Sequence, residues 1–97
     1  MKEEIRILRD KADEITAFYE QKVDSYLALG EEGFNLNSEN VNESIVLAGT
    51  ANRYRHKFAW YLNDSPLIEE CGIDIEKEAA DFKAQFAAFF EQTSPAV

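Results

Sequence analysis

The chain has 97 residues, a hydrophobic fraction of 45% and a formal net charge of -9. This length suits one small domain with its own core and is too short for two, so we expect a single helical domain over residues 1–97. No apolar run approaches the roughly 20 residues of a transmembrane helix, and the charged N-terminus does not resemble a signal peptide, so we expect a cytoplasmic protein without a membrane segment.

The predicted fold class is all-α. Four glycines and two prolines are too few for a turn-rich β fold. Helical patterns occupy about residues 3–29, 40–62, 66–71 and 74–92, and we expect a small helical bundle of three main helices plus one short helix, with near-antiparallel neighbours.

The first predicted helix carries a continuous apolar stripe. Its members recur at steps of three and four, as on a helix turning about 100° per residue; they are Ile5, Leu8, Ala12, Ile15, Tyr19, Val23 and Tyr26. Gly30 can adopt the left-handed backbone conformation that commonly follows a helix, so we expect this helix to end there. Residues 30–39 are predicted to form a loop that tucks Phe34 and Leu36 under the bundle.

The second predicted helix begins at Asn40, whose side chain can accept a hydrogen bond from a backbone amide of the first turn. The Glu43 side chain can accept one from the backbone amide of Asn40 in return. Its predicted inward face consists of Val41, Ile45, Ala48, Ala51, Phe58 and Leu62.

An outward stripe on this second helix is the first candidate site. Residues 53–62 contain the only histidine, the only tryptophan and the one run of bases in the chain. Arg53, Lys57 and Trp60 fall on the side of the helix away from the core, with His56 adjacent. Tryptophan and arginine dominate interface energies, so these residues are candidates for binding a partner. The alternative is that the bases pair within the chain with Glu69, Glu70 or Asp74, and that Trp60 closes the core over them.

The C-terminal part is predicted to contain a short helix, capped by Ser65 with Pro66 at its first position, and a last helix capped by Asp74. The apolar stripe of the last helix consists of Ile75, Ala79, Phe82, Phe86, Phe89 and Phe90. Ala80, Ala84, Ala87 and Ala88 form a second surface of small residues on it.

Catalytic and metal-binding patterns are missing from the sequence. His56 sits among bases with no acid to orient it, and Cys71 follows two glutamates that disfavour a thiolate. A structural zinc site needs four Cys or His ligands, whereas the chain has one of each. We therefore expect no enzyme activity, no cofactor or metal, and no small-molecule substrate.

The acidic residues form the second candidate site. Residues 30–45 contain four acids and no base, and residues 63–97 contain eight acids and two bases. Such charge steers a protein away from nucleic acid and toward basic protein surfaces. The exposed pairs Glu31 with Glu32 and Glu69 with Glu70 are the candidate contacts.

These features predict a non-catalytic protein that binds a protein partner, as an inhibitor or regulator that mimics nucleic acid on a basic nucleic-acid-binding surface. In size, acidity and lack of a catalytic motif, the chain is similar to the small inhibitors that phages and mobile elements encode against host nucleic-acid machinery. An alternative is a homo-oligomeric adaptor or structural bundle, such as a homodimer, that acts through apolar helix faces. A weaker alternative is direct nucleic-acid contact through the Arg53–Trp60 stripe, which the net charge disfavours.

Overall fold

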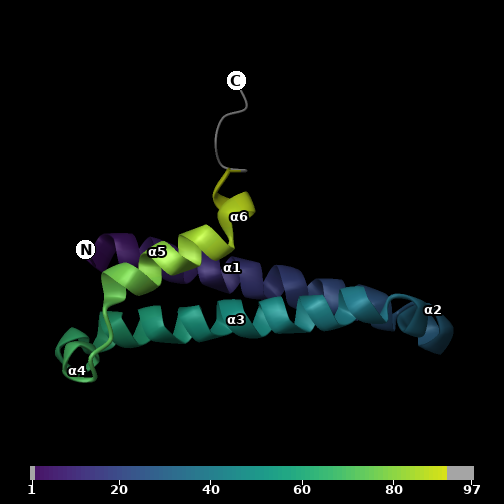
Figure 1. Ribbon diagram of the computed structural model, residues 1–97, viewed down its shortest axis with the longest axis horizontal. Helices are drawn as coiled ribbons and strands as arrows, with labels where there is room; N and C mark the ends of the chain where they lie inside the picture. Colours follow the sequence, from purple (N-terminus) through teal and green to yellow (C-terminus); the bar gives the residue numbers. More distant parts are fainter. Residues whose placement is uncertain (1, 92–97) are drawn as a thin grey trace.

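The structure, a computed structural model, describes residues 2–91 and is all-α over this range, as the sequence predicted. The described residues form six helices (Figure 1): α1 (Lys2–Leu27), α2 (Gly30–Leu36), α3 (Ser38–Asn63), α4 (Ser65–Glu70), α5 (Ile75–Gln85) and α6 (Ala87–Glu91). Over residues 2–91, no helix combines the length and apolar character that crossing a membrane requires.

A long antiparallel hairpin of α1 and α3 is the frame of the molecule (Figure 1). Each helix has 26 residues, or about 39 Å at 1.5 Å per residue. The short helix α2 closes one end of the hairpin, and α4 lies at the other end. We call residues 17–50 the turn half of the hairpin and the remainder the open half.

The open half holds the hydrophobic core because α5 lies across it as a third helix (Figure 1). Phe82 of α5 is fully buried. Its ring centroid lies 5.3 Å from that of Tyr54 and 5.4 Å from that of Phe58, both on α3. Edge and tilted contacts at these distances are favoured by aromatic quadrupoles. The aromatic residues therefore join α5 to α3, while Ile5 and Leu8 of α1 complete the same core.

The core stops halfway along the hairpin. The predicted stripe of α1 is buried from Ile5 to Ile15, but Tyr19, Val23 and Tyr26 are only half-buried. Helix α5 has 11 residues and is too short to reach them. Helix α6 covers only the start of the turn half, through Phe89, whose ring centroid lies 5.3 Å from that of Phe18 and 5.8 Å from that of Tyr19, and further along the hairpin Val23 and Tyr26 remain half-buried.

The predicted loop over residues 30–39 is wrong, because residues Gly30–Leu36 form the helix α2. Gly30 adopts a φ of 83°, which reverses the chain as predicted and which only glycine adopts readily. Leu29 lies so close to Gly33 that a Cβ at Gly33 would approach the Cβ of Leu29 to 2.6 Å. The side-chain amide of Asn37 donates a hydrogen bond to the backbone carbonyl of Gly33 at 2.8 Å. These contacts allow a seven-residue helix where glycine and asparagine indicated a loop.

Several predicted side-chain positions and caps around this segment are also wrong. Leu36 is 81% exposed instead of tucked under the bundle, and Ile45 is 52% exposed instead of facing inward. Helix α3 begins at Ser38, so Asn40 is not its cap, and the residue preceding it, Asn37, makes no side-chain cap bond.

The C-terminal helices differ from their predictions in two respects. Asp64 rather than Ser65 caps α4, by accepting a hydrogen bond from the Leu67 amide. The predicted helix over 74–92 is broken at Phe86, which has a φ of -115° and a ψ of 35°. The break turns α6 away from α5 (Figure 1) and lets Phe89 contact Phe18 of α1, with ring centroids 5.3 Å apart. The end of the predicted helix, residue 92, lies outside the described residues.

The predicted cap at Asp74 is confirmed, and its removal should weaken the domain. The Asp74 carboxylate accepts hydrogen bonds from the amides of Glu76 and Lys77 at 3.1 and 3.2 Å. We expect Asp74→Ala to lower the free energy of unfolding by about 1 kcal/mol, as for other N-caps, in urea denaturation. Asp74→Asn keeps an accepting oxygen and should recover most of the loss. If both variants lose the same amount, the cap does not carry the effect.

Candidate partner-binding surfaces

The outward stripe of α3 is exposed as predicted. Trp60 is 40% exposed, whereas its neighbours Phe58 and Tyr61 are 0% and 7% exposed and belong to the core. Arg53 and His56 are also exposed, and Lys57 is half-buried. Trp60 therefore does not close the core over these bases, and it is available to a partner.

Two of the bases in residues 53–62, Arg55 and Lys57, are occupied within the molecule. Arg55 donates to Asn52 at 2.6 Å and forms an ion pair with Asp13 of α1 at 3.3 Å. Lys57 pairs with Glu78 of α5 at 3.2 Å. Of the stripe bases, Lys57 thus pairs within the chain, as the alternative interpretation expected, but with Glu78 instead of Glu69, Glu70 or Asp74. Little uncompensated positive charge remains for a nucleic acid.

Arg53 differs from the other two bases. Its guanidinium donates to the Thr50 hydroxyl at 3.3 Å, and it belongs to none of the ion pairs found over the described range. Arg53 thus combines an exposed guanidinium with the absence of an ion pair over the described residues, and Trp60 adds an exposed aromatic side chain to the same stripe.

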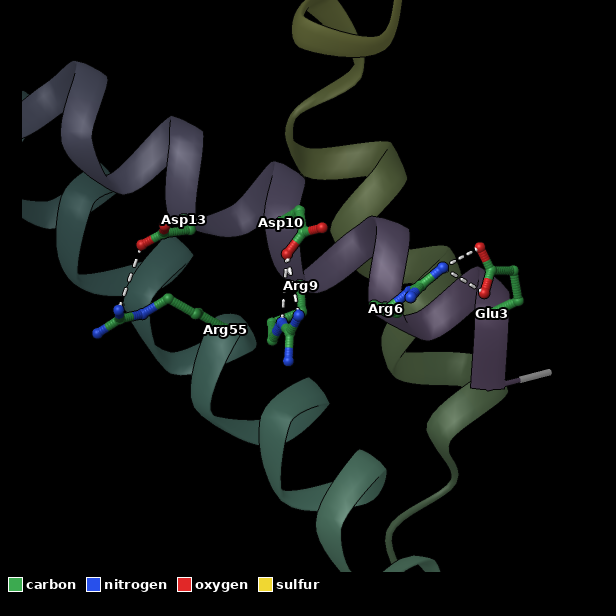
Figure 2. A network of polar contacts seen from close by, with 6 residues as sticks. All are labelled: Glu3, Arg6, Arg9, Asp10, Asp13 and Arg55. Carbon is green, nitrogen blue, oxygen red and sulfur yellow. Dashed lines mark hydrogen bonds and ion pairs between the residues drawn. The ribbon is translucent and has the colours of Figure 1, made fainter.

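The acids in the first half of α1 are neutralised by bases (Figure 2). Asp13 pairs with Arg55 across the hairpin, and Asp10 with Arg9 at 3.1 Å. Glu3 accepts two hydrogen bonds from Arg6, and this contact raises the pKa of the Arg6 guanidinium above its usual value. Lys83 of α5 and Lys11 pair with the two remaining acids of this segment, Glu4 and Glu14. The open half of α1 therefore presents little net charge.

The acids of the turn half are not neutralised in this way. Between residues 17 and 50 the chain has one base, Lys22, and six acids, which are Glu20, Asp24, Glu31, Glu32, Glu39 and Glu43. Within the described part of the chain, none of these seven residues is in an ion pair, and all are exposed. The turn half is therefore a negatively charged surface with a local net charge of -5.

The two candidate glutamate pairs lie far apart. Glu31 and Glu32 lie on α2 and Glu69 and Glu70 on α4, at opposite ends of a molecule 49 Å long (Figure 1). All four side chains are exposed. The structure does not bring them into one acidic patch, so they belong to two separate surfaces.

The pKa values of two tyrosines are raised by burial and by nearby carboxylates. The pKa of Tyr19 is raised above its usual value by burial and then by the nearby Glu43 carboxylate. The pKa of Tyr54 is raised by burial and by Glu78 and Asp81, with Arg53 opposing them. The negative charge of Glu43 thus favours the protonated form of Tyr19.

The turn half exposes most of the large apolar side chains that the fold leaves uncovered. Of the nine large apolar side chains that are exposed in the described part of the chain, six lie there. They are Phe18, Leu27, Leu29, Leu36, Ile45 and Val46. Of these, Leu36 and Ile45 were predicted to be buried, and helical periodicity cannot reveal where the covering helix ends.

The single histidine and the single cysteine do not belong to a metal-binding cluster in residues 2–91. His56 and Cys71 are exposed, and no cluster of three or more His, Cys, Asp or Glu side chains in this range could hold a metal ion. A comparison with protein-family models, curated proteins and solved structures finds no match to this chain.

Proposed function

We propose that this protein is a non-catalytic regulator that binds a protein partner, and that it inhibits the partner by occupying a basic surface used for nucleic acid. The proposal includes action in the cytoplasm, as for the small inhibitors of phages and mobile elements. The observation that carries it is the turn half, where six exposed carboxylates accompany one base and none is in an ion pair within the described residues.

The charge distribution supports a protein partner over direct nucleic-acid binding. Surfaces that bind nucleic acid are basic because they neutralise phosphates. A carboxylate surface is attracted to the same lysines and arginines and competes with the phosphates for them. The bases of α3 do not offer an opposite route, since Arg55 and Lys57 already pair with acids of this chain.

A homodimer that acts through apolar helix faces is the second candidate. It is favoured by the exposed Ile45 and Val46 on α3, which are 52% and 64% exposed. An apolar interface differs from an electrostatic one in its response to salt, because charges separated by more than a Debye length of about 8 Å at physiological ionic strength are screened.

Capture of the partner at two salt concentrations tests the proposal. Affinity-tagged full-length protein is incubated with lysate of its native host at low and high salt, and bound proteins are identified by mass spectrometry. We expect a nucleic-acid-binding protein that is recovered at low salt and lost at high salt. With that partner purified, added inhibitor should release its DNA or RNA in a mobility-shift assay.

The same preparations distinguish the alternative. Light scattering gives the mass of the protein in solution at each salt concentration. A dimer that persists at high salt, together with no captured nucleic-acid-binding protein, would contradict the inhibitor proposal and support the homodimer.

A further inference from the structure

We propose that the turn end of the hairpin, formed by α2 and the adjoining ends of α1 and α3, is a docking surface for a basic amphipathic helix of the partner protein. This inference rests on the proposed function and deepens it, because it names the surface used and the kind of segment that binds.

The apolar part of this surface consists of three leucines that the fold leaves uncovered. Leu27 ends α1, Leu29 lies in the turn and Leu36 ends α2, and they are 56%, 58% and 81% exposed. Leu36 also lines a shallow hollow with Glu31, Glu32 and Asn35 of the same helix. Large apolar side chains left exposed close together along the chain and accompanied by charged residues are the kind of feature that marks protein-binding sites.

The acidic part surrounds these leucines along the chain. Glu31 and Glu32 share the hollow with Leu36, Glu20 and Asp24 lie in the last turns of α1, and Glu39 lies in the first turn of α3. The leucines therefore lie in a segment whose exposed carboxylates form no ion pair within the described part of this chain.

An amphipathic helix with basic flanks matches both parts. Its apolar stripe, with residues repeating at three and four positions, would cover the leucines, as in other helix-in-groove complexes. Lysines and arginines beside the stripe would then meet the glutamates. Helices of this type also occur on nucleic-acid-binding surfaces, where the basic side contacts phosphate.

The charge disfavours the other common occupants of the turn end. A second copy would bring one local charge of -5 against another, which repels. The same repulsion acts against an anionic membrane surface and against nucleic acid. A basic protein segment is therefore the occupant that the electrostatics favour.

A synthetic peptide tests the surface directly. The probe is a helix of about 18 residues, or five turns, made of leucine and lysine with the leucines on one face. The control peptide has the same composition in an order without amphipathic periodicity. Titration into ¹⁵N-labelled full-length protein should shift the resonances of residues 24–39 and leave those of α4 and α5 unchanged, and the control peptide should bind at least about tenfold more weakly.

Matched variants at the two ends of the molecule separate the site from general charge. We expect Glu31→Gln with Glu32→Gln to raise the peptide Kd about tenfold, and Leu36→Ser to do the same. Glu69→Gln with Glu70→Gln removes the same charge from α4 and should change the Kd by less than about twofold. All substituted side chains are exposed, and far-UV circular dichroism checks that each variant keeps its fold.

Three results would overturn the inference. They are equal binding of both peptides, shifts centred on α3 or α4, and a dimer that Leu36→Ser dissociates.

The test also separates this inference from the proposed function. If the native partner is captured and the Glu31 and Leu36 variants capture it equally well, the docking surface is wrong and the function stands. If the peptide binds at the turn end but no nucleic-acid-binding protein is captured, the function fails and the surface stands.

Discussion

Replacing Phe82 by alanine is expected to lower the free energy of unfolding by about 3 to 5 kcal/mol, the usual cost of deleting a buried phenylalanine. Phe82 has no exposed surface and lies within 5.7 Å, between ring centroids, of Tyr54, Phe58, Phe86 and Phe90. It is therefore the residue through which α5 is held on the hairpin. A domain of this size has about 5 to 15 kcal/mol of stability in total, so the variant should be close to unfolded at room temperature.

Urea denaturation of both Phe82→Ala and Leu36→Ala measures this effect. Leu36→Ala also removes a large apolar side chain, but from a position that is 81% exposed, and a surface change of this kind usually stays within about 0.5 kcal/mol. Similar losses in the two variants would mean that α5 is not needed for the fold.

Hydrogen exchange should divide the hairpin into two halves. We expect backbone amides in residues 20–27 and 39–46 to exchange about 100-fold faster than those in residues 5–15 and 51–61, after correction for intrinsic rates. This corresponds to opening free energies that differ by about 3 kcal/mol. The reason is burial, since the turn half contributes few fully buried side chains, such as Val41 and Ser44, and regions with few buried contacts open locally.

The exchange rates of the two halves are compared within the same two continuous helices, which makes the test stringent. Both α1 and α3 run through the two halves, so differences between separate elements do not enter. Uniform protection along α1 would show that the hairpin opens only as one unit, and would contradict the division into halves.

The fold class and the buried stripe could be predicted from the sequence because both depend on local periodicity. The spacing from Ile5 to Ile15 indicates a helix face that is buried, and it is. The same spacing continues through Tyr19, Val23 and Tyr26, which are only half-buried. Periodicity identifies a face that can be buried, but whether another helix reaches that face depends on the length and placement of α5.

The candidate sites were predictable only in part, for a related reason. The exposure of Trp60 follows from its angular position on α3. The partners of the bases do not, because Arg55 and Asp13 are 42 positions apart and Lys57 and Glu78 are 21 apart. Such pairs depend on how the helices align. The exposure of Leu36 was missed because two glycines and two asparagines obscured the helix α2, at whose end the Asn37 side chain donates a hydrogen bond to the Gly33 carbonyl.

The position of the core also determines how the chain can fold. A hairpin usually gains stability first at its turn, because the residues there are closest in sequence and least entropy is lost when they meet. In this protein the turn contributes the least burial, and the core joins Ile5 to Phe58 and Phe82, across most of the chain. Closing that long loop costs entropy before the contacts that offset it can form. We therefore expect folding not to zip outward from α2, and we expect its transition state to bring both ends of the chain together.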